Sequence, residues 1–242
     1  MAAPTALTLI NQTRRFLRDW KSYDSLSLSV ASSASSTTLI VGDNTIYAKR
    51  WPIEIDQELM MVTALGGTAS LTVSRAMMGS TIASHATSAS ILIRPDYFSV
   101  EILDAINEAI QACFPAIYKP VVDNTSSIAT STYSYTIPDT PGYTGYPLPF
   151  VSAVEVRQPG DFRYRSTRRW EMRRGASTST STTTGSDDVS PAIVFRSLPP
   201  VTSTLRIKGY GPFPPLVNMG DTLDPLFPPQ AWYLLPIYAA GS

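Results

Sequence analysis

A β-hairpin between Glu58 and Ala89 is the feature of this sequence that most limits how the chain can fold. Residues 58–64 and 69–75 alternate between apolar and polar side chains, and Gly66-Gly67 lies between them. Glycine suits a two-residue primed turn because the central backbone of such a turn takes a positive φ. A period of two also places one face of each strand in a core. The segment therefore predicts two antiparallel strands joined by a tight turn.

The same alternation extends over residues 25–94 and predicts a complete β-module. Further strands are expected at 26–30, 39–41, 53–55 and 90–94. Together with the hairpin they are enough for a small barrel or sandwich. Three acidic residues share one strand face, and we expect a solvated surface there ahead of a cation site. These acidic residues are Glu54, Asp56 and Glu58.

An amphipathic helix is predicted at residues 5–20, before the β-module. Arg14, Arg15 and Arg18 lie on faces other than the apolar one. We interpret them as a solvated face, with docking on an acidic partner surface as the alternative. The apolar positions, which recur at helical spacing, are Leu7, Ile10, Phe16, Leu17 and Trp20.

A second and stronger helix is predicted after the β-module, from Ser99 to Ile117. Ser99 is the expected N-cap, since a serine oxygen can accept a hydrogen bond from the first turn, and Pro120 ends the segment. The two helices are expected to pack together. The apolar stripe consists of Phe98, Ile102, Ile106, Ile110, Cys113 or Phe114, and Ile117, and the polar side of Glu101, Asp104, Asn107, Glu108 and Gln111.

The remaining chain is again β-like, so the predicted fold class is α+β and β-rich. Residues 1–24 and 95–120 form the helical core, 25–94 the inserted module, 121–224 a second β-rich region, and 225–242 an apolar C-terminal segment. Strands in the second region are expected at 132–137, 149–158, 168–173, 191–197 and 203–210, with a loop at 138–149 and a mobile Ser/Thr-rich loop at 176–188.

The composition excludes several classes of protein. The formal net charge is zero and 16% of the residues are charged, so electrostatic steering toward nucleic acid is not expected. A single cysteine cannot form an internal disulfide. No apolar run approaches the roughly 18 residues that a membrane span needs. The sequence therefore predicts a soluble protein made in the cytoplasm, with no membrane partner.

Catalytic chemistry is not indicated by the sequence. His85 is the only histidine, and it lies in the hairpin exit far along the chain from Cys113, the only cysteine. A catalytic triad or a zinc cluster would need more such residues at closer spacing, and no phosphate-binding glycine loop occurs. We therefore predict no catalytic residue, no metal site and no cofactor, and interpret the protein as non-enzymatic.

Two segments are candidates for binding a partner. Residues 157–174 interleave arginines with aromatic side chains, a composition that favours a protein interface; a solvated hairpin edge and contact with DNA are the alternatives. The C-terminal segment is too apolar to remain bare, and Pro236 is expected to prevent a regular helix. We predict that it becomes ordered against a neighbour; folding back onto the chain's own β-domain is the alternative. The candidate residues are Arg157, Arg163, Arg165, Arg168, Arg169, Trp170, Arg173, Arg174, Trp232, Tyr233, Leu235 and Tyr238.

The hairpin exit, Arg75-x-x-x-Gly79-x-Thr81-x-Ala83-x-His85, resembles one found in structural proteins of tailed bacteriophage particles. Ala76 and Ser88 stand where that pattern usually has glycine. Taken with the Arg-rich helix at 13–20, the helix at 101–110 and the stretch 205–211, the chain resembles a head–tail connector, also called an adaptor or neck protein.

This resemblance implies a structural role in the virion, assembled in the host cytoplasm. Proteins of that family form a homo-oligomeric ring, commonly twelvefold, below the portal protein, and the ring supplies a docking surface for tail or neck proteins. Genomic DNA passes through without tight sequence-specific binding. Another tail component, such as a tail-tip, baseplate or fibre-associated protein, is the alternative, because such proteins also use the hairpin module.

Overall fold

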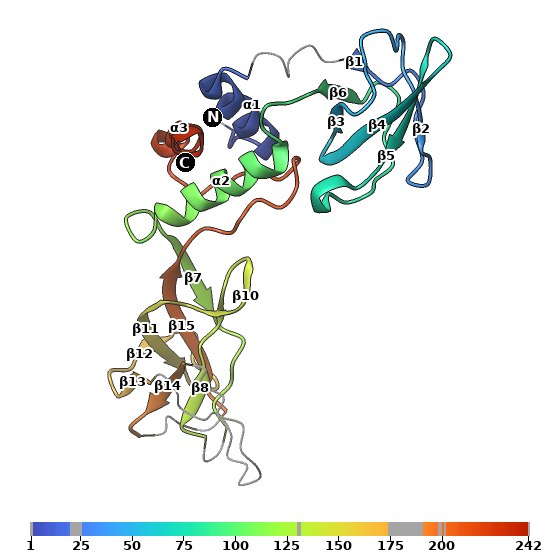
Figure 1. Cartoon of the computed structure of the whole chain (residues 1–242). Helices are drawn as coiled ribbons and strands as arrows, with labels where there is room; N and C mark the ends of the chain where they lie inside the picture. Colours follow the sequence, from blue (N-terminus) through green and yellow to red (C-terminus); the bar gives the residue numbers. More distant parts are fainter. Residues whose placement is uncertain are drawn as a thin grey trace. The chain divides into compact units, whose positions relative to one another are not determined.

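The computed structural model describes residues 2–19, 26–129, 132–173, 191–197, 200 and 202–241. The chain forms two compact units, and each is considered by itself (Figure 1). Unit 1 comprises residues 1–109, 216–225 and 229–242, and unit 2 comprises residues 110–215 and 226–228. Three helices and several antiparallel sheets confirm the predicted α+β, β-rich class.

The β-module of unit 1 is a six-stranded antiparallel sheet in the order β1-β6-β3-β4-β5-β2. Its interior is formed by the apolar side chains of the alternating pattern, including Ile53, Met60, Val62 and Leu71, which are fully buried. Each expected strand is present. The strands are β1 (Leu26–Ser27), β2 (Thr38–Ile40), β3 (Pro52–Ile55), β4 (Glu58–Gly66), β5 (Ser70–Ser74) and β6 (Ser90–Ile93).

The two edges of this sheet approach each other without forming a closed barrel. A single bridge pairs Leu28, after β1, with Val41, after β2, and the N–H of Ser29 donates to the carbonyl of Ile40 at 2.9 Å. No continuous ladder among the described strands joins the two edges. The module is therefore a curled, open sheet around one apolar interior.

The hairpin loop is longer by one residue than the sequence predicts. Gly66 pairs with Ser70 and belongs to β4, so the loop consists of residues 67–69. Only Gly67 takes a positive φ, +55°. A shift in register between Val62 and Ala64 accompanies this change, as expected for a bulged hairpin.

Helix α1 (Ala6–Leu17) buries a different face from the one predicted. Its buried residues are Ala6, Leu9, Ile10, Thr13 and Arg14, whereas Leu7 and Phe16 are about half exposed. The predicted stripe was right at Ile10 but wrong at Leu7 and Phe16, and it left out the buried Arg14. Arg14 is 2% exposed, while Arg15 and Arg18 face solvent as expected. Trp20, the last residue of that stripe, lies outside the described residues.

Helix α2 (Ser99–Ala112) has the predicted apolar stripe but ends earlier than expected. Ile102, Ile106 and Ile110 are buried. The helix stops at Ala112, so Pro120 does not end it and lies instead in strand β7 (Lys119–Asp123). Residues 113–120 are therefore not helical, contrary to the predicted extent of the helical core.

Helix α3 (Leu234–Gly241) corrects the expectation that Pro236 prevents a regular helix. Pro236 lies in the first turn of the helix. Backbone N–H groups in that turn have no partner within the helix, so the missing N–H of proline costs no hydrogen bond and the helix is not broken. Leu235 and Ala239 are buried, and α3 lies beside α1 of the same chain (Figure 1). Residues 229–241 of the segment thus belong to unit 1, where α3 packs against α1.

The residues before α3 return to the start of α1. The N–H groups of Ala6 and Leu7, which lack partners within their own helix, donate to the carbonyls of Asp221 (2.8 Å) and Met219 (3.0 Å). Asn107 on α2 binds the same returning segment: its Nδ2 donates to the carbonyl of Leu216 at 2.9 Å, and its Oδ1 accepts from the N–H of Leu216 at 2.8 Å. The returning chain therefore fastens both α1 and α2.

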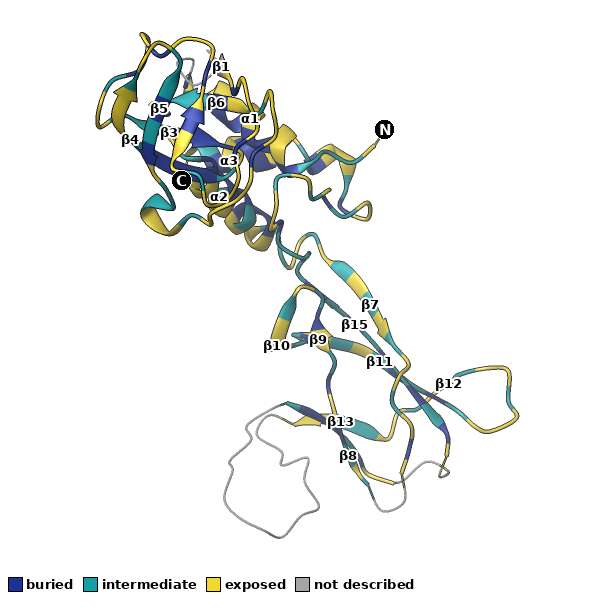
Figure 2. Ribbon diagram, turned by 90° about the vertical axis from the view of Figure 1, so that its right-hand side faces the viewer, coloured by how far each residue is buried: buried dark blue, intermediate teal, exposed yellow. Residues whose placement is uncertain are grey.

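Unit 2 contains three small antiparallel sheets around a second apolar core (Figure 2). The sheets have the orders β12-β11-β15-β7, β13-β14-β8 and β10-β9. The five expected strands are present, and β9 and β10 form a hairpin within the predicted loop. The bounds are β8 (Ser134–Thr136), β9 (Asp139–Thr140), β10 (Tyr143–Pro147), β11 (Phe150–Arg157), β12 (Arg165–Ser166), β13 (Trp170–Arg173), β14 (Ala192–Phe195) and β15 (Thr204–Gly211). The Ser/Thr-rich loop predicted at 176–188 lies outside the described residues.

A buried arginine ties the helices of unit 1 to its sheet. Arg14 donates to Asp19 at 2.8 Å, to Ser99 Oγ at 2.9 Å and to Glu54 on β3 at 3.5 Å. The Glu54 carboxylate also accepts from the backbone N–H of Ser99 at 3.2 Å. Glu54 therefore caps the N-terminus of α2, a role that the sequence assigned to Ser99 itself. Burial raises the pKa of Glu54, against the hydrogen bonds from Ser99 and the charge of Arg14.

We predict that Arg14→Met lowers the free energy of unfolding by about 3–5 kcal/mol, because it removes the guanidinium that pairs with the buried carboxylates of Glu54 and Asp19. Urea unfolding of the full chain at pH 7 measures this. Arg15→Met is the matched control, since the neighbouring arginine is exposed, and it should change the free energy by less than about 0.5 kcal/mol. Equal effects of the two substitutions would contradict the role of Arg14.

Candidate functional site

The hairpin exit is organised around one buried carboxylate. Glu58 at the start of β4 is 1% exposed and accepts from Arg75 Nε (2.8 Å) and Nη2 (2.5 Å), from the backbone N–H of Ala83 (2.9 Å), and from His85 Nε2 (3.0 Å). We call Glu58, Arg75, Ala83 and His85 the clasp. It fastens the residues that follow β5 to the beginning of β4.

Arg75 also binds the backbone on the other side of the exit. Its Nη1 donates to the carbonyls of Ser33 (2.6 Å) and Ser36 (3.1 Å), and its Nη2 reaches the carbonyl of Ala83. A guanidinium has five N–H donors in a fixed fork, and here they bind one carboxylate and three carbonyls. Lysine could not make these contacts from one position.

His85 is held between two carboxylates. Its Nδ1 lies 2.7 Å from Asp56 Oδ2 and its Nε2 lies 3.0 Å from Glu58, and the side chain is 2% exposed. Because both ring nitrogens are engaged within the fold, neither is free to act as a general base toward a bound molecule. The prediction that Glu54, Asp56 and Glu58 form a solvated face was wrong for Glu54 and Glu58, which are buried.

The clasp keeps Glu58 ionised. Burial alone would raise the pKa of Glu58, but the hydrogen bonds from Arg75, Ala83 and His85 together lower it to about 2. A carboxylate with several charged and backbone donors is stabilised in its charged form. The cluster is therefore a structural ion pair network at neutral pH.

Three non-glycine residues in and just after the exit take glycine-like backbone, namely Ala76, Met78 (φ 51°) and Ser88. Ala76 has a φ of 54° and Ser88 a φ of 70°, and these are the positions at which the related pattern usually has glycine. Gly79, a fixed residue of the pattern, has a φ of 80°. The chain therefore adopts left-handed backbone at Ala76 and Ser88 without a glycine at either position.

The arginine strip, which we define as residues 157–173, follows β11, β12 and β13 of unit 2. The structure brings its residues together only in part. Tyr164 lies between two guanidinium groups, with Arg157 5.1 Å and Arg206 3.8 Å from the ring centroid. Trp170 is half-buried against the core of the unit, and Arg174 lies outside the described residues. Arg206 of β15 belongs to this surface, although the sequence pattern did not include it.

Acidic residues neutralise part of the strip. Glu171 pairs with Arg173 and, at 3.1 Å, with Arg196, and these two arginines lower the pKa of Glu171. Asp161 lies 3.4 Å from Arg165. Within the part of the chain that the structure describes, Arg163 and Arg168 make no ion pair.

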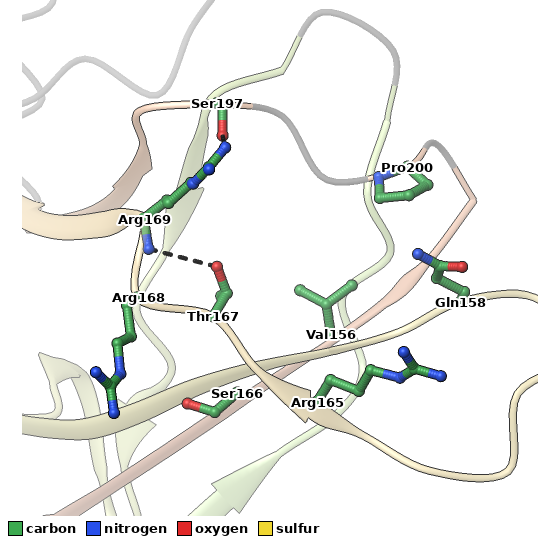
Figure 3. Close-up of a pocket in the computed structure, with 9 residues that line it drawn as sticks. All are labelled: Val156, Gln158, Arg165, Ser166, Thr167, Arg168, Arg169, Ser197 and Pro200. Carbon is green, nitrogen blue, oxygen red and sulfur yellow. Dashed lines mark hydrogen bonds between the residues drawn. The ribbon is translucent and has the colours of Figure 1, made fainter.

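A shallow pocket of about 430 Å³ lies in the strip. Figure 3 shows Arg169 on one side, 3.4 Å from Ser197 Oγ, Arg165 on the other side near Gln158, and Val156 between them. Exposed guanidinium and hydroxyl groups of this kind can bind a carboxylate or a phosphate. The pocket is therefore a candidate contact for an anionic partner group.

The predicted C-terminal interface residues are divided by the structure. Leu235 is 1% exposed and belongs to the core of unit 1, which corrects its assignment as an interface residue. Trp232 is half-buried. Tyr233 and Tyr238 keep more than half of their surface exposed and remain candidates.

Glu58 is the site residue that sequence reasoning missed. The hairpin register gives the signal that could have found it. Val62 pairs with Val73 and Met61 with Ser74, so Glu58 lies across from the residues that follow Arg75. An acid placed beside an arginine on the neighbouring strand favours an ion pair over a solvated face.

Comparison of the chain with protein-family models, curated proteins and solved structures gave no match. Among the described residues, no group of three His, Cys, Asp or Glu side chains is placed to hold a metal ion. No helix in the described ranges is long and apolar enough to cross a membrane.

We predict that Glu58→Gln changes how stability depends on pH. The folded pKa of about 2 lies below the ordinary value of 4.5, so the charged form stabilises the fold above pH 4.5, and this contribution is lost as the pH falls toward 2. At pH 7 it is at most about 3 kcal/mol, since each unit of the difference in pKa corresponds to about 1.4 kcal/mol and solvent screening reduces the total. Urea unfolding at pH 7, 4.5 and 3 should show the gap between wild type and variant shrinking. A gap that stays constant over that range would exclude the assigned pKa; Glu101→Gln is the exposed control.

We predict that Ala76→Gly stabilises the chain. Left-handed backbone costs a non-glycine residue about 1–2 kcal/mol, more than the roughly 0.4–1 kcal/mol of unfolded-state entropy that glycine adds. Thermal unfolding should therefore shift upward. Ala69→Gly, in a turn position with negative φ, is the control and should shift it downward. A lower melting temperature for Ala76→Gly would rule out the strain.

Proposed function

We propose that this protein is a structural subunit of a tailed-phage particle, a head–tail adaptor that joins the portal to the tail as a member of a ring. The observation that carries the proposal is the clasp. Arg75, Gly79 and His85, which are fixed residues of the phage hairpin exit, each have a defined structural role here. The resemblance therefore rests on residues that determine a local structure and not on composition alone.

The organisation of unit 1 supports the adaptor over the alternative. The β-module lies in the chain between α1 and α2, and α3 returns to α1. A tail-tip, baseplate or fibre-associated protein built on the same module is expected to be β throughout. In this proposal the role is structural and not enzymatic, the location is the neck of the virion, and DNA passes without tight binding.

The test is assembly with a candidate portal. Purified full-length chain mixed with portal rings should produce complexes whose mass rises in multiples of 26.3 kDa, measured by mass photometry. Binding to tail-tip components but not to the portal would support the alternative. Binding to neither set of proteins would overturn the proposal. A portal of an unrelated phage is the control for non-specific adhesion.

A further inference from the structure

The net charge of the chain is zero because its two units carry opposite charges of equal size. Unit 1 contains 8 Lys and Arg residues and 12 Asp and Glu residues, which gives a formal charge of −4. Unit 2 contains 11 basic and 7 acidic residues, which gives +4. Complementary charge of this kind favours contact between the unlike units of two molecules.

Unit 1 carries an apolar groove with acidic residues along it. The groove has a volume of about 840 Å³ and lies between the short helix η2 (Met77–Gly79), the first turns of α2 and the loop at 217–220. Met78, Phe98 and Met219 contribute apolar surface, and Met78 is 75% exposed. Glu101 and Asp104 of α2 line the same groove and face solvent. Methionine side chains adapt readily to an inserted aromatic ring.

Unit 2 carries a surface that matches this groove. Phe162 is 99% exposed at the tip of the loop between β11 and β12. Arg163 follows it directly, and Arg163 and Arg168 have no ion-pair partner among the described residues. A bare aromatic side chain next to Arg163, with Arg168 further along the same strip after β12, has the composition of an interface centre.

We propose that the Phe162 loop and its arginines in one copy dock in the acidic groove of a second copy. Phe162 enters between the methionines, while Arg163 and Arg168 face Glu101 and Asp104. The contact is heterologous, because two different surfaces meet, and repetition of such a contact generates a ring when the rotation closes. The inference rests on the proposed function, since it names the faces through which ring subunits meet.

A second copy fits the strip better than nucleic acid does. Asp161 and Glu171 lie within the strip and would repel phosphate groups. The acidic groove offers carboxylates and apolar surface together, which match the arginines and the phenyl ring. Both halves of the contact are present on one chain.

Charge reversal tests the contact. The strip variant carries Arg163→Glu and Arg168→Glu, and the groove variant carries Glu101→Lys and Asp104→Lys. Each variant alone presents like charges on both surfaces, so its self-association should weaken about tenfold or more relative to wild type at 50 mM salt. An equimolar mixture restores opposite charges and should regain association. Sedimentation velocity measures the oligomers, and circular dichroism checks folding.

The control variant carries Arg15→Glu and Arg18→Glu, which reverse two exposed arginines on α1 outside the strip. It should associate as wild type does. A parallel titration with duplex DNA tests whether the strip binds nucleic acid instead of a second copy of the chain. A strip variant that loses DNA binding but keeps self-association would overturn the proposal.

Three further results would overturn it. These are a wild-type chain that stays monomeric at about 100 μM, variants that associate normally, and a mixture that does not recover. The proposed function is separable from this contact. If wild type binds the portal while the mixture stays apart, the interface is wrong and the function stands. If the mixture regains self-association but neither the wild type nor any variant binds the portal, the proposed contact is correct and the proposed function is wrong.

Discussion

The structure of unit 1 depends on the buried contact between Arg14 and Glu54. Arg14 belongs to α1, Glu54 to β3, and the Ser99 backbone at the start of α2 donates to the same carboxylate. Three elements far apart in sequence therefore meet at one ion pair. Removing a charge from water is costly, and the cost is recovered only when the geometry satisfies every donor and acceptor. This requirement fixes where each helix meets the sheet.

The clasp applies the same principle four residues further along the chain. Glu54 and Glu58 lie on either side of the β3–β4 turn, and both are buried. Glu54 accepts hydrogen bonds from α1 and from the start of α2. Glu58 binds the hairpin exit of its own module through Arg75 and His85. The β3–β4 hairpin thus supplies both the carboxylate that binds the helices and the carboxylate that binds the hairpin exit.

The fold class and most strands could be predicted because period-two alternation records burial directly. The buried face of α2 could be predicted because Ile102, Ile106 and Ile110 recur every four residues, a spacing that places them on one face of a helix. The buried charges could not be found this way. A periodicity argument treats Arg14 and Glu58 as polar, whereas their burial depends on partners at distant positions. Pro236 was misjudged because its effect depends on its position within the helix, which the start of α3 determines.

The arginines of this chain divide by whether the fold already uses them. The side chains of Arg14 and Arg75 are almost fully buried, and their N–H groups donate to side-chain and backbone oxygens of the same unit. Arginine serves there because its planar fork binds several acceptors from one position. Arg163 and Arg168 face solvent and make no ion pair with any described residue, so their binding capacity is available to another molecule. A preference of 15 arginines over 4 lysines is therefore consistent with two demands, a core held by buried ion pairs and a surface suited to carboxylate partners.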